Sequence, residues 1–416
     1  MRKSARCQIT YVVQQFPPEV GAGPARVLET ARRWLQRGAS VTVVTAMPNR
    51  PEGRIHAAYR GKLTTVEEVE GIRVLRSWLY ASPKHGFIRT IVNNLTWMVT
   101  GGLHALLRMG RADVLIASSP PFFPHLSGVV VSRMRGVPLV LEIRDLWPDY
   151  LVDMGVLGGA PARALFALER WLLRRAALVV VVTESFKRRV VAKGVAEDRV
   201  IVIPNGVDAN FYRASSEAPP LPELVRREGE LLVGYLGNFG AGQNLATVIE
   251  AAALLGDVRP DIRFAMAGDG PQRDALVALL LQRPRARLTI HPPISKEQTR
   301  GFYNACDVNL VVLAPVDVFQ DTVPSKIFEV MACERPLVAS LAGEAQRIVE
   351  ESGAGLVVPP GDAAALADGI VRLLAVPAPE RKEMGRRARR YVSERYAREA
   401  LADGYLSALQ RVSRGA

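Results

Sequence analysis

Cysteine is scarce in this sequence, and the usual motifs of metal-binding proteins are missing. The 416 residues contain three cysteines, Cys7, Cys306 and Cys333, at long spacings and without a C-x-x-C pair. A disulfide framework or a zinc site is therefore not expected, and reduced thiols are the default. The sequence also has no D-x-D pair and no H-E-x-x-H motif, and its five histidines are scattered. We accordingly expect neither a metal ion nor a cofactor.

Long apolar runs are missing as well, and aromatic residues make up only 6% of the chain. No stretch of about 18 residues is apolar throughout, so no membrane-spanning segment is predicted. The basic N-terminus, Met1–Cys7, precedes an apolar run, Ile9–Val13, that is too short for the core of a signal peptide. The G-x-x-x-x-G-K-[ST] motif is absent too, which argues against ATP hydrolysis of the P-loop type.

An excess of positive charge is present, and it is confined to the first half of the chain. Residues 1–205 carry 29 basic and 15 acidic side chains, a net charge of +14. Residues 206–416 carry 25 basic and 26 acidic side chains, a net charge of −1. We therefore expect the first half to meet an anionic partner, such as a phosphate group, a nucleic acid or an acidic membrane surface.

Short β-branched runs alternate with amphipathic helical segments in both halves, which predicts βαβ units and parallel sheets. We predict an α/β protein with two doubly wound, Rossmann-like domains and a ligand cleft between them. The expected domains are residues 1–205 and 206–385, followed by a helical segment, 386–416, that packs back toward the first domain. The expected strands are Ile9–Val13, Ser40–Ala46, Val114–Ala117, Pro138–Ile143 and Leu178–Val182 in the first half, and Leu231–Leu236, Arg263–Ala267, Leu288–His291, Val308–Val312, Leu337–Ser340 and Leu356–Val358 in the second.

The most specific segment of the chain is Asp321–Glu329, with the sequence DTVPSKIFE. Pro324 suits the first turn of a helix, and Glu329 then lies one turn after Ser325 and Lys326 on the same face. Free N–H groups and the positive end of the helix dipole, beside a lysine, suit a diphosphate, and the carboxylate can accept hydrogen bonds from ribose hydroxyls. An ordinary helix start with a surface ion pair fits the same spacing equally well.

The extended segment DTVPSKIFEVMACERPLVAS resembles the donor-nucleotide motif of the family 4 retaining glycosyltransferases, which have the GT-B fold. Agreement in order and spacing extends to VGYLGNFGAGQNLATVIEAA, RFAMAGDGPQRDALV, ACDVNLVVL and GLVVPPGDAAALADGI. The passage between that family's two domains resembles PNGVDANF. A narrower subgroup, the WbuB-like transferases of surface-polysaccharide synthesis, which includes N-acetyl-fucosamine transferases, is similar to this chain at LEIRDLWPDYLVDMGVL and ASSPPFF. The resemblance covers nearly the whole chain.

This resemblance implies a donor site in the second half. The family has two acids separated by seven residues, and these places are held by Asp321, where a glutamate is usual, and Glu329. Glu329 would bind the donor ribose, Asp321 would lie near the sugar ring and the diphosphate, and Lys326 would contact the phosphates. The remaining donor-site candidates are Ser325, Gly237, Asn238, Gly268, Asp269 and Glu344. On spacing alone, Gly268-Asp269-Gly270 is also a common turn, and Glu344 is also a favourable charge at a helix start.

The chain departs from the family at two places. Many relatives carry an arginine and a lysine in the first loop of the second domain, where this chain has Asn238 and Gln243. The diphosphate charge would then be met mainly by Lys326, by backbone N–H groups and by the first domain. Many relatives also have a histidine after the strand that matches Pro138–Ile143, and here Arg144 holds about that place.

Candidate residues of the first half lie after two predicted strands. Gly21 and Gly23 follow the first, where glycine lets the backbone approach a diphosphate or an acceptor, although a plain βα turn fits as well. Asp145 could orient or deprotonate the acceptor hydroxyl, and Glu142 is a competing candidate. Either carboxylate could instead be structural and paired with Arg144. The expected catalytic residues are Lys326, Asp145, Arg144 and Asp321.

Residues 71–112 contain six Lys or Arg and no Asp or Glu. The middle of this stretch, Thr90–Leu107, carries no formal charge when His104 is neutral. We expect a helix that lies in the membrane interface, and the alternative is a partly buried helix of the first domain with basic ends. The basic residues near its ends are Lys84, Arg89, Arg108 and Arg111.

Together these observations predict a retaining glycosyltransferase that moves a hexosyl or N-acetylhexosaminyl group, such as an N-acetyl-fucosamine-like sugar, from a UDP-sugar. The expected acceptor is linked to a lipid diphosphate and belongs to bacterial cell-surface polysaccharide or O-antigen synthesis. The first domain would bind the acceptor and the second the nucleotide sugar. We expect a metal-independent peripheral protein on the anionic cytoplasmic face of the inner membrane. The alternatives are a nucleotide-sugar 2-epimerase of the same fold, a basic nucleic-acid-binding protein and a catalytically idle scaffold.

Overall fold

The computed structural model describes residues 7–19, 21–50, 52–83, 86–215, 221–225 and 227–415. Its contacts divide the chain into two units, Met1–Pro204 with Arg398–Ala416, and Asn205–Ala397. The second unit therefore extends beyond the expected end at residue 385, which falls inside helix α13 (Ala378–Arg395). The last helix, α14 (Arg398–Arg414), belongs to the first unit, because Trp34 Nε1 donates a hydrogen bond to its Ala402 carbonyl.

The first unit contains an eight-stranded sheet in the order β3-β4-β2-β1-β5-β6-β7-β8, in which only β3 is antiparallel to its neighbour. The six strands from β4 to β7 follow the 3-2-1-4-5-6 order of a Rossmann fold. Their sequences are nearly continuous apolar runs because both faces of the sheet are covered. The elements are β1 (Gln8–Val12), α1 (Ala22–Gln36), β2 (Ser40–Ala46), β3 (Thr64–Val69), β4 (Ile72–Ser77), α2 (Phe87–Arg108), β5 (Val114–Ser119), α3 (Pro124–Arg135), β6 (Leu139–Ile143), α4 (Trp147–Asp153), α5 (Gly159–Leu173), β7 (Leu178–Val181), α6 (Glu184–Ala192) and β8 (Val200–Val202), completed by α14.

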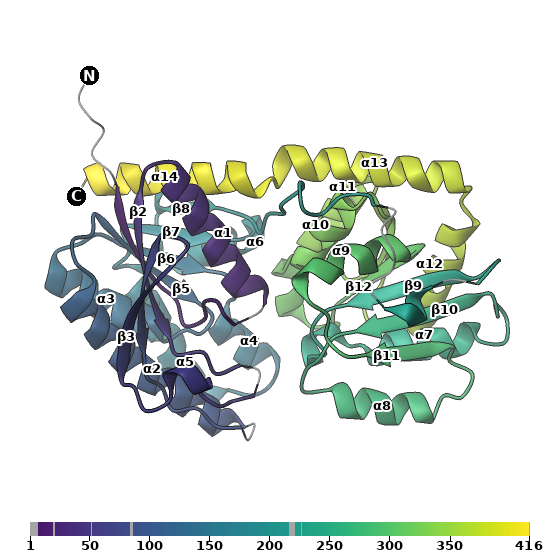
Figure 1. Ribbon diagram of the computed structural model, residues 1–416, viewed down its shortest axis with the longest axis horizontal. Coiled ribbons are helices and arrows are strands. Elements are labelled where there is room, and N and C mark those ends of the chain that lie inside the picture. The colour runs from purple at the N-terminus through teal and green to yellow at the C-terminus, as the bar shows by residue number, and fades with distance from the viewer. Residues whose placement is uncertain are drawn as a thin grey trace. The chain divides into compact units, whose positions relative to one another are not determined.

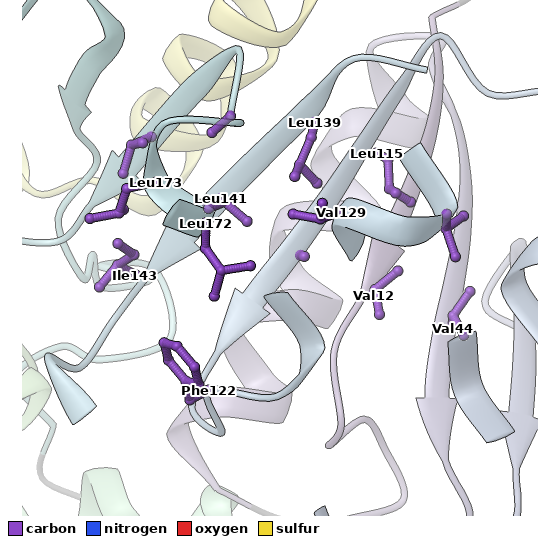
Figure 2. Close-up of a cluster of buried hydrophobic side chains, with 14 of the residues drawn as sticks. Val12, Val44, Leu115, Phe122, Val129, Leu139, Leu141, Ile143, Leu172 and Leu173 are labelled. Atoms are coloured by element: carbon purple, nitrogen blue, oxygen red, sulfur yellow. The ribbon is translucent and has the colours of Figure 1, made fainter. Parts of the chain in front are cut away.

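Each face of this sheet has its own core. Helices α1 and α14 cover one face, where Trp34 and Tyr405 pack edge to face with ring centroids 5.2 Å apart. Helices α2, α3, α5 and α6 cover the other. Figure 2 shows part of that second core, in which Val12 and Leu141 of the strands face Val129 of α3 and Leu172 of α5.

The second unit contains a six-stranded, fully parallel sheet in the order β11-β10-β9-β12-β13-β14, which is again the Rossmann order. Helices α7, α8 and α12 pack on one face, and α9, α10, α11 and α13 pack on the other (Figure 1). The elements are β9 (Leu231–Leu236), α7 (Ala246–Leu255), β10 (Ile262–Ala267), α8 (Arg273–Leu281), β11 (Leu288–His291), α9 (Lys296–Ala305), β12 (Val308–Val312), the 3-10 helix η5 (Asp317–Asp321), α10 (Ser325–Ala332), β13 (Leu337–Ser340), α11 (Glu344–Ser352), β14 (Gly355–Val358) and α12 (Ala363–Ala375), followed by α13.

The predicted strands are confirmed, with ends that move by one or two residues. The patterns considered above do not predict β3, β4 and β8. Strands β3 and β4 form a hairpin through a turn in which Glu70 and Gly71 both have positive φ, 54° and 79°. Asn-Gly and Asp-Gly are the usual sequence signals for a two-residue turn with positive φ at both positions, and Glu-Gly is not, so the sequence does not predict this hairpin.

Helix α2 is partly buried in the first unit. Trp97 and Ala105 are fully buried against the sheet and α3, while Val99 and Leu103 lie on an exposed face. Lys84 lies outside the described residues, so only the other three expected basic residues are placed. None of the described helices is both long and apolar enough to cross a membrane.

Candidate active site

Helix α10 presents its first residues at the edge of the second sheet. Pro324 precedes it with an extended backbone conformation and stands at its N-cap. Ile327, Phe328 and Met331 are buried and fix the helix to the core. Ser325, Lys326 and Glu329 are consequently only half-buried, on the side of the helix that the core leaves open.

The Lys326 ammonium lies in an apolar corner, one helical turn from Glu329. Its Nζ is 3.9 Å from the centroid of the Tyr235 ring. Burial lowers the pKa of Lys326 to about 7, although Glu329 acts to raise it. No hydrogen bond or ion pair to Nζ is present among the residues that the structure describes. An anion bound beside Nζ would restore the charged form of this lysine.

Glu329 lies one turn deeper and is held by phenol groups. The Tyr303 hydroxyl donates a hydrogen bond to Glu329 Oε2 at 2.8 Å. Burial raises the pKa of Glu329, and the Tyr303 hydrogen bond, Lys326, Lys296 and a hydrogen bond from Tyr212 each counteract part of that rise. The carboxylate therefore combines a desolvated position with fixed donors.

Glycines at the ends of two neighbouring strands leave room beside Lys326. Gly237 follows β9 with a φ of 146°, and a Cβ atom there would lie 2.7 Å from Lys326 Nζ. Gly268 follows β10 with a φ of 150°, and a Cβ atom there would lie 1.8 Å from the Gly237 carbonyl oxygen. Glycine at 268 thus lets the two strand ends approach, and glycine at 237 leaves room for the Lys326 ammonium.

The other donor-site candidates lie on the surrounding loops. Asn238 is exposed, and Asp269 is exposed with its Oδ1 accepting a hydrogen bond from the next backbone N–H, that of Gly270. Gln243 accepts a hydrogen bond from the Gly240 N–H, so its side chain stabilises the loop in which many relatives carry a lysine. Neither Asn238 nor Gln243 therefore supplies positive charge to this loop.

The start of α11 lies against the loop that precedes α10. Gly343 has a φ of 78°, and a Cβ atom there would lie 2.0 Å from the Gln320 carbonyl oxygen. This contact brings Glu344, the first residue of α11, and half-buried Asp321, the last residue of η5, to the same edge as Lys326. Strands β9, β10, β12 and β13 are parallel, so the loops after them share one edge of the sheet.

In the first unit, Glu142 lies on β6 and is completely buried. It accepts hydrogen bonds from the Tyr11 hydroxyl, from Ser118 Oγ at 2.6 Å and from Arg26 Nη2 at 3.4 Å. Burial raises the pKa of this carboxyl, but Arg26, Arg144 and the two hydroxyl donors outweigh it and hold the pKa below its usual value. Glu142 is thus an ionised carboxylate inside the core, closed to a substrate.

Arg144 and Asp145 follow Glu142 at the end of the strand. Arg144 Nε donates a hydrogen bond to the Ser119 carbonyl at 2.9 Å, and a Cβ atom at Gly23 would lie 3.2 Å from Arg144 Nη1. Gly23 therefore makes room for a guanidinium at the start of α1, and Gly21 precedes that helix with a φ of 149°. Asp145 is exposed as a residue. Desolvation of its carboxyl by nearby protein atoms raises the pKa to about 6, while the positive charge of Arg144 acts to lower it.

Family models match most of the chain. One described as a glycosyl transferase 4-like domain matches residues 21–206, and one described as glycosyl transferases group 1 matches residues 230–376. The chain belongs to this glycosyltransferase family.

Named relatives of this glycosyltransferase agree with that assignment. The putative colanic acid biosynthesis glycosyl transferase WcaI of Escherichia coli is 26% identical over 89% of this chain and 92% of its own length. The probable glycosyltransferase WbjE of Pseudomonas aeruginosa is 27% identical over 62% of this chain and 66% of its own length. An alpha-D-kanosaminyltransferase of Streptomyces kanamyceticus is 30% identical over 68% of this chain and 72% of its own length.

Solved structures show the GT-B fold of this glycosyltransferase. Sucrose-phosphate synthase from Thermosynechococcus elongatus superposes with a TM-score of 0.78 at 20% identity over 99% of this chain and 100% of that one. Anabaena HepE, crystallised with UDP-glucose, superposes with a TM-score of 0.69 at 18% identity over 97% of this chain and 99% of that one. These likenesses establish the fold and leave the substrates to be argued from the site.

Three residues around the site of this glycosyltransferase are not predicted from its sequence. Tyr235 lies beneath Lys326, Tyr303 holds Glu329, and Arg273 Nη1 donates hydrogen bonds to the carbonyls of Gly268 and His291. In the sequence, Tyr235 and Phe264 have the same setting, because each is an aromatic residue within an apolar strand. Only the packing shows which of them reaches a functional side chain.

Proposed function

We propose that this glycosyltransferase moves a sugar from a UDP-sugar to a lipid-diphosphate-linked acceptor, with retention at the anomeric carbon, in cell-surface polysaccharide synthesis. The observation that carries the proposal is the Lys326 ammonium at the start of α10, in an apolar corner beside Gly237. A half-buried cation next to the free N–H groups of a helix start suits a diphosphate. The UDP-glucose bound to HepE and the colanic acid named for WcaI support the donor and product classes.

In the proposed reaction the second unit binds the donor and the first unit the acceptor. The anomeric C–O bond breaks with oxocarbenium character, and Lys326 with the N–H groups of α10 stabilises the charge that develops on the departing diphosphate. The acceptor oxygen then bonds to the anomeric carbon on the face that the diphosphate leaves, and the leaving phosphate oxygen takes the acceptor proton. Asp145 orients the acceptor hydroxyl, since Glu142 is enclosed by its three donors. Asp321 and Glu344 lie on the sugar side of the site, and no metal ion takes part.

We extend the proposal to an anionic membrane as the place where the lipid-linked acceptor is met. Helices α2 and α3 pack together, and each leaves apolar side chains exposed; we call this set of side chains the α2–α3 face. Neither helix carries an acidic residue, and Arg89, Arg108 and Arg133 belong to them. Apolar side chains with basic neighbours suit the interface of an anionic bilayer, and vesicle binding checks this. The α2–α3 face consists of Ile88, Val92, Leu95, Val99, Leu103, Leu107, Val130 and Met134.

Sugar transfer by Lys326→Ala tests the proposed function. Removing the cation is expected to lower turnover by a factor of roughly 100 or more, the scale of losing one preorganised electrostatic group. Folding should be retained, because a lysine whose burial disfavours its charge contributes little stability. Lys382→Ala on α13 is the control, since that lysine lies outside the site. Near-normal transfer by Lys326→Ala would contradict the assignment.

Incubation of the wild-type protein with UDP-sugars alone separates the proposal from the epimerase alternative. A transferase leaves the sugar configuration unchanged without an acceptor, whereas a 2-epimerase changes it, and NMR of the product mixture distinguishes the two. Transfer to a lipid-diphosphate acceptor is expected to persist in EDTA, because Lys326 and α10 supply the positive charge. Epimerised product without any transfer would replace the proposal.

A further inference from the structure

We propose that Tyr303 is a positioning residue for the donor ribose: its hydroxyl fixes the Glu329 carboxylate in the orientation and charge state that accept the ribose hydroxyls. This inference rests on the proposed function, because it gives a role to a side chain that acts through Glu329. It adds that selection of ribose over deoxyribose depends on a phenol on α9.

The geometry separates Tyr303 from an ordinary core aromatic residue. Its ring is 3% exposed and packs beside Phe302, which is completely buried. A phenylalanine would fill this space equally well, and a buried hydroxyl requires a partner. The partner of the Tyr303 hydroxyl is Glu329 Oε2, at 2.8 Å. The hydroxyl of Tyr303 therefore binds the Glu329 carboxylate, and its ring packs in the core.

The donors to this carboxylate come from two separate parts of the second unit. Tyr303 belongs to α9, whereas Tyr212 precedes β9 in the chain and is 5% exposed. Thr299 Oγ1 donates a hydrogen bond to the Tyr212 hydroxyl at 3.3 Å, which ties Tyr212 to α9. Glu329 itself is carried by α10, so the carboxylate cannot rotate freely between these elements.

Orientation matters because a carboxylate must keep acceptor lone pairs for the ribose. Both Glu329 oxygens are acceptors only while the group is ionised, and protonation converts one of them into a donor. The Tyr303 hydrogen bond favours the ionised form, which burial disfavours. The other charged or titratable groups facing Glu329 are Lys296 of α9, Lys326 of α10, Cys333 directly after α10, and Tyr212.

The test compares binding of UDP and 2′-deoxy-UDP to the full-length protein by calorimetry, with Tyr303→Phe as the variant. The wild type is expected to prefer UDP. Tyr303→Phe should weaken UDP binding by about tenfold, the scale of one hydrogen bond to a charged group, and weaken 2′-deoxy-UDP binding less. The ratio of the two affinities therefore falls. UDP affinity falls at acid pH when Glu329 becomes protonated. In Tyr303→Phe this fall, the acid limb of the pH profile, should lie at higher pH, because Glu329 then protonates more readily.

A matched control is available in the same unit. The Tyr391 hydroxyl donates a hydrogen bond to Glu351 Oε2 at 2.9 Å on the exposed surface, so Tyr391→Phe removes the same kind of bond away from the site. Its affinity ratio and pH profile should equal those of the wild type. A double-mutant cycle with Glu329→Gln guards against a purely structural effect, because Tyr303→Phe should change UDP affinity little once the carboxylate is gone.

The outcomes separate this inference from the proposed function. If the wild type binds neither nucleotide, the proposed function fails and the role of Tyr303 fails with it. If the wild type prefers UDP but Tyr303→Phe keeps both the affinity ratio and the acid limb, only the role of Tyr303 is overturned. Should Tyr303→Phe fail to fold, Tyr212→Phe gives the same readout, and an unchanged ratio in that variant likewise overturns the phenol mechanism.

Discussion

Three ionisable side chains differ in how their neighbours affect their charge: Glu142 is completely buried, whereas Glu329 and Lys326 are half-buried. Glu142 is surrounded by hydroxyl and guanidinium donors and stays ionised inside the core. Glu329 has phenol donors and a lysine one turn away, yet its pKa is raised. Lys326 has an aromatic ring in place of a carboxylate, and its pKa falls. The charge of Glu142 is stabilised by the protein itself. The charges of Glu329 and Lys326 are destabilised by burial, so a ligand that interacts with them can gain binding free energy.

The pKa of Lys326 predicts how nucleotide affinity depends on pH. A diphosphate binds the charged form, so above a pH of about 7 the free protein must take up a proton on binding. UDP affinity should therefore fall above pH 7, by at most tenfold per pH unit, until the higher pKa of the bound lysine is passed. Below pH 7 this lysine should add no slope.

Calorimetry in buffers of different ionisation enthalpy checks this expectation. Proton uptake on UDP binding should rise toward one between pH 7 and pH 8.5. Lys326→Gln, which cannot titrate, should show no such uptake, and Lys382→Gln should behave as the wild type. Equal proton uptake by Lys326→Gln and the wild type would assign the titration to another group.

At the scale of elements, α2 is anchored on one side and apolar on the other. Gly102 packs against Ser127 of α3, where a Cβ atom would lie 3.0 Å from Ser127 Cβ, so the two helices meet closely. The exposed residues Val92, Leu95, Val99 and Leu103 recur at helical spacing on the opposite side. A helix with this pattern suits a lipid surface, and its burial against the sheet determines which face is presented.

The double variant Val99→Asp/Leu103→Asp is expected to weaken membrane binding at least tenfold. Each aspartate removes apolar area and repels anionic headgroups. Co-sedimentation with vesicles of phosphatidylcholine and phosphatidylglycerol measures the effect, and binding of the wild type should weaken with added salt. The control, Val277→Asp/Leu281→Asp on α8 of the second unit, has the same spacing and two exposed side chains. Equal sedimentation of both variants and the wild type would exclude the α2–α3 face as the docking surface.

At the scale of the whole molecule, the chain passes from the first unit to the second after Pro204 and returns after Ala397. Val207 pairs with Ala397 in an isolated parallel bridge, and its N–H donates to the Tyr396 carbonyl at 2.9 Å. The returning helix α14 then completes the core of the first unit. That unit is therefore built from two distant parts of the sequence.

Leu409→Ala should destabilise the first unit by about 2–5 kcal/mol, because this α14 side chain is completely buried beside α1. In thermal unfolding, the first unit of the variant should melt at a lower temperature than in the wild type. The two units need not unfold together. UDP should still raise the melting temperature of the second unit in this variant, because the proposed donor site lies in that unit. Leu281→Ala, at an 80% exposed position, should change stability by less than about 0.5 kcal/mol. An unchanged first transition in Leu409→Ala would contradict this role of α14.

The local sequence determined much of this protein. Apolar, β-branched runs such as SVTVVTA and LLVGYL favour strands buried on both faces, and their alternation with helices predicts two doubly wound sheets. The DTVPSKIFE segment located α10 and its lysine, because a proline before an amphipathic run sets the helix start.

Tertiary structure decided what depends on contacts between distant residues. The ring under Lys326 comes from β9, the hydroxyl on Glu329 comes from α9, and the enclosure of Glu142 comes from β1, α1 and β5. The second unit runs to Ala397, past the expected boundary at residue 385, since α13 and α14 have similar helical patterns and only their packing partners differ. Periodicity records which face of an element is buried, but a pKa or an orientation depends on what lies opposite that face, which the chain specifies only once it is folded.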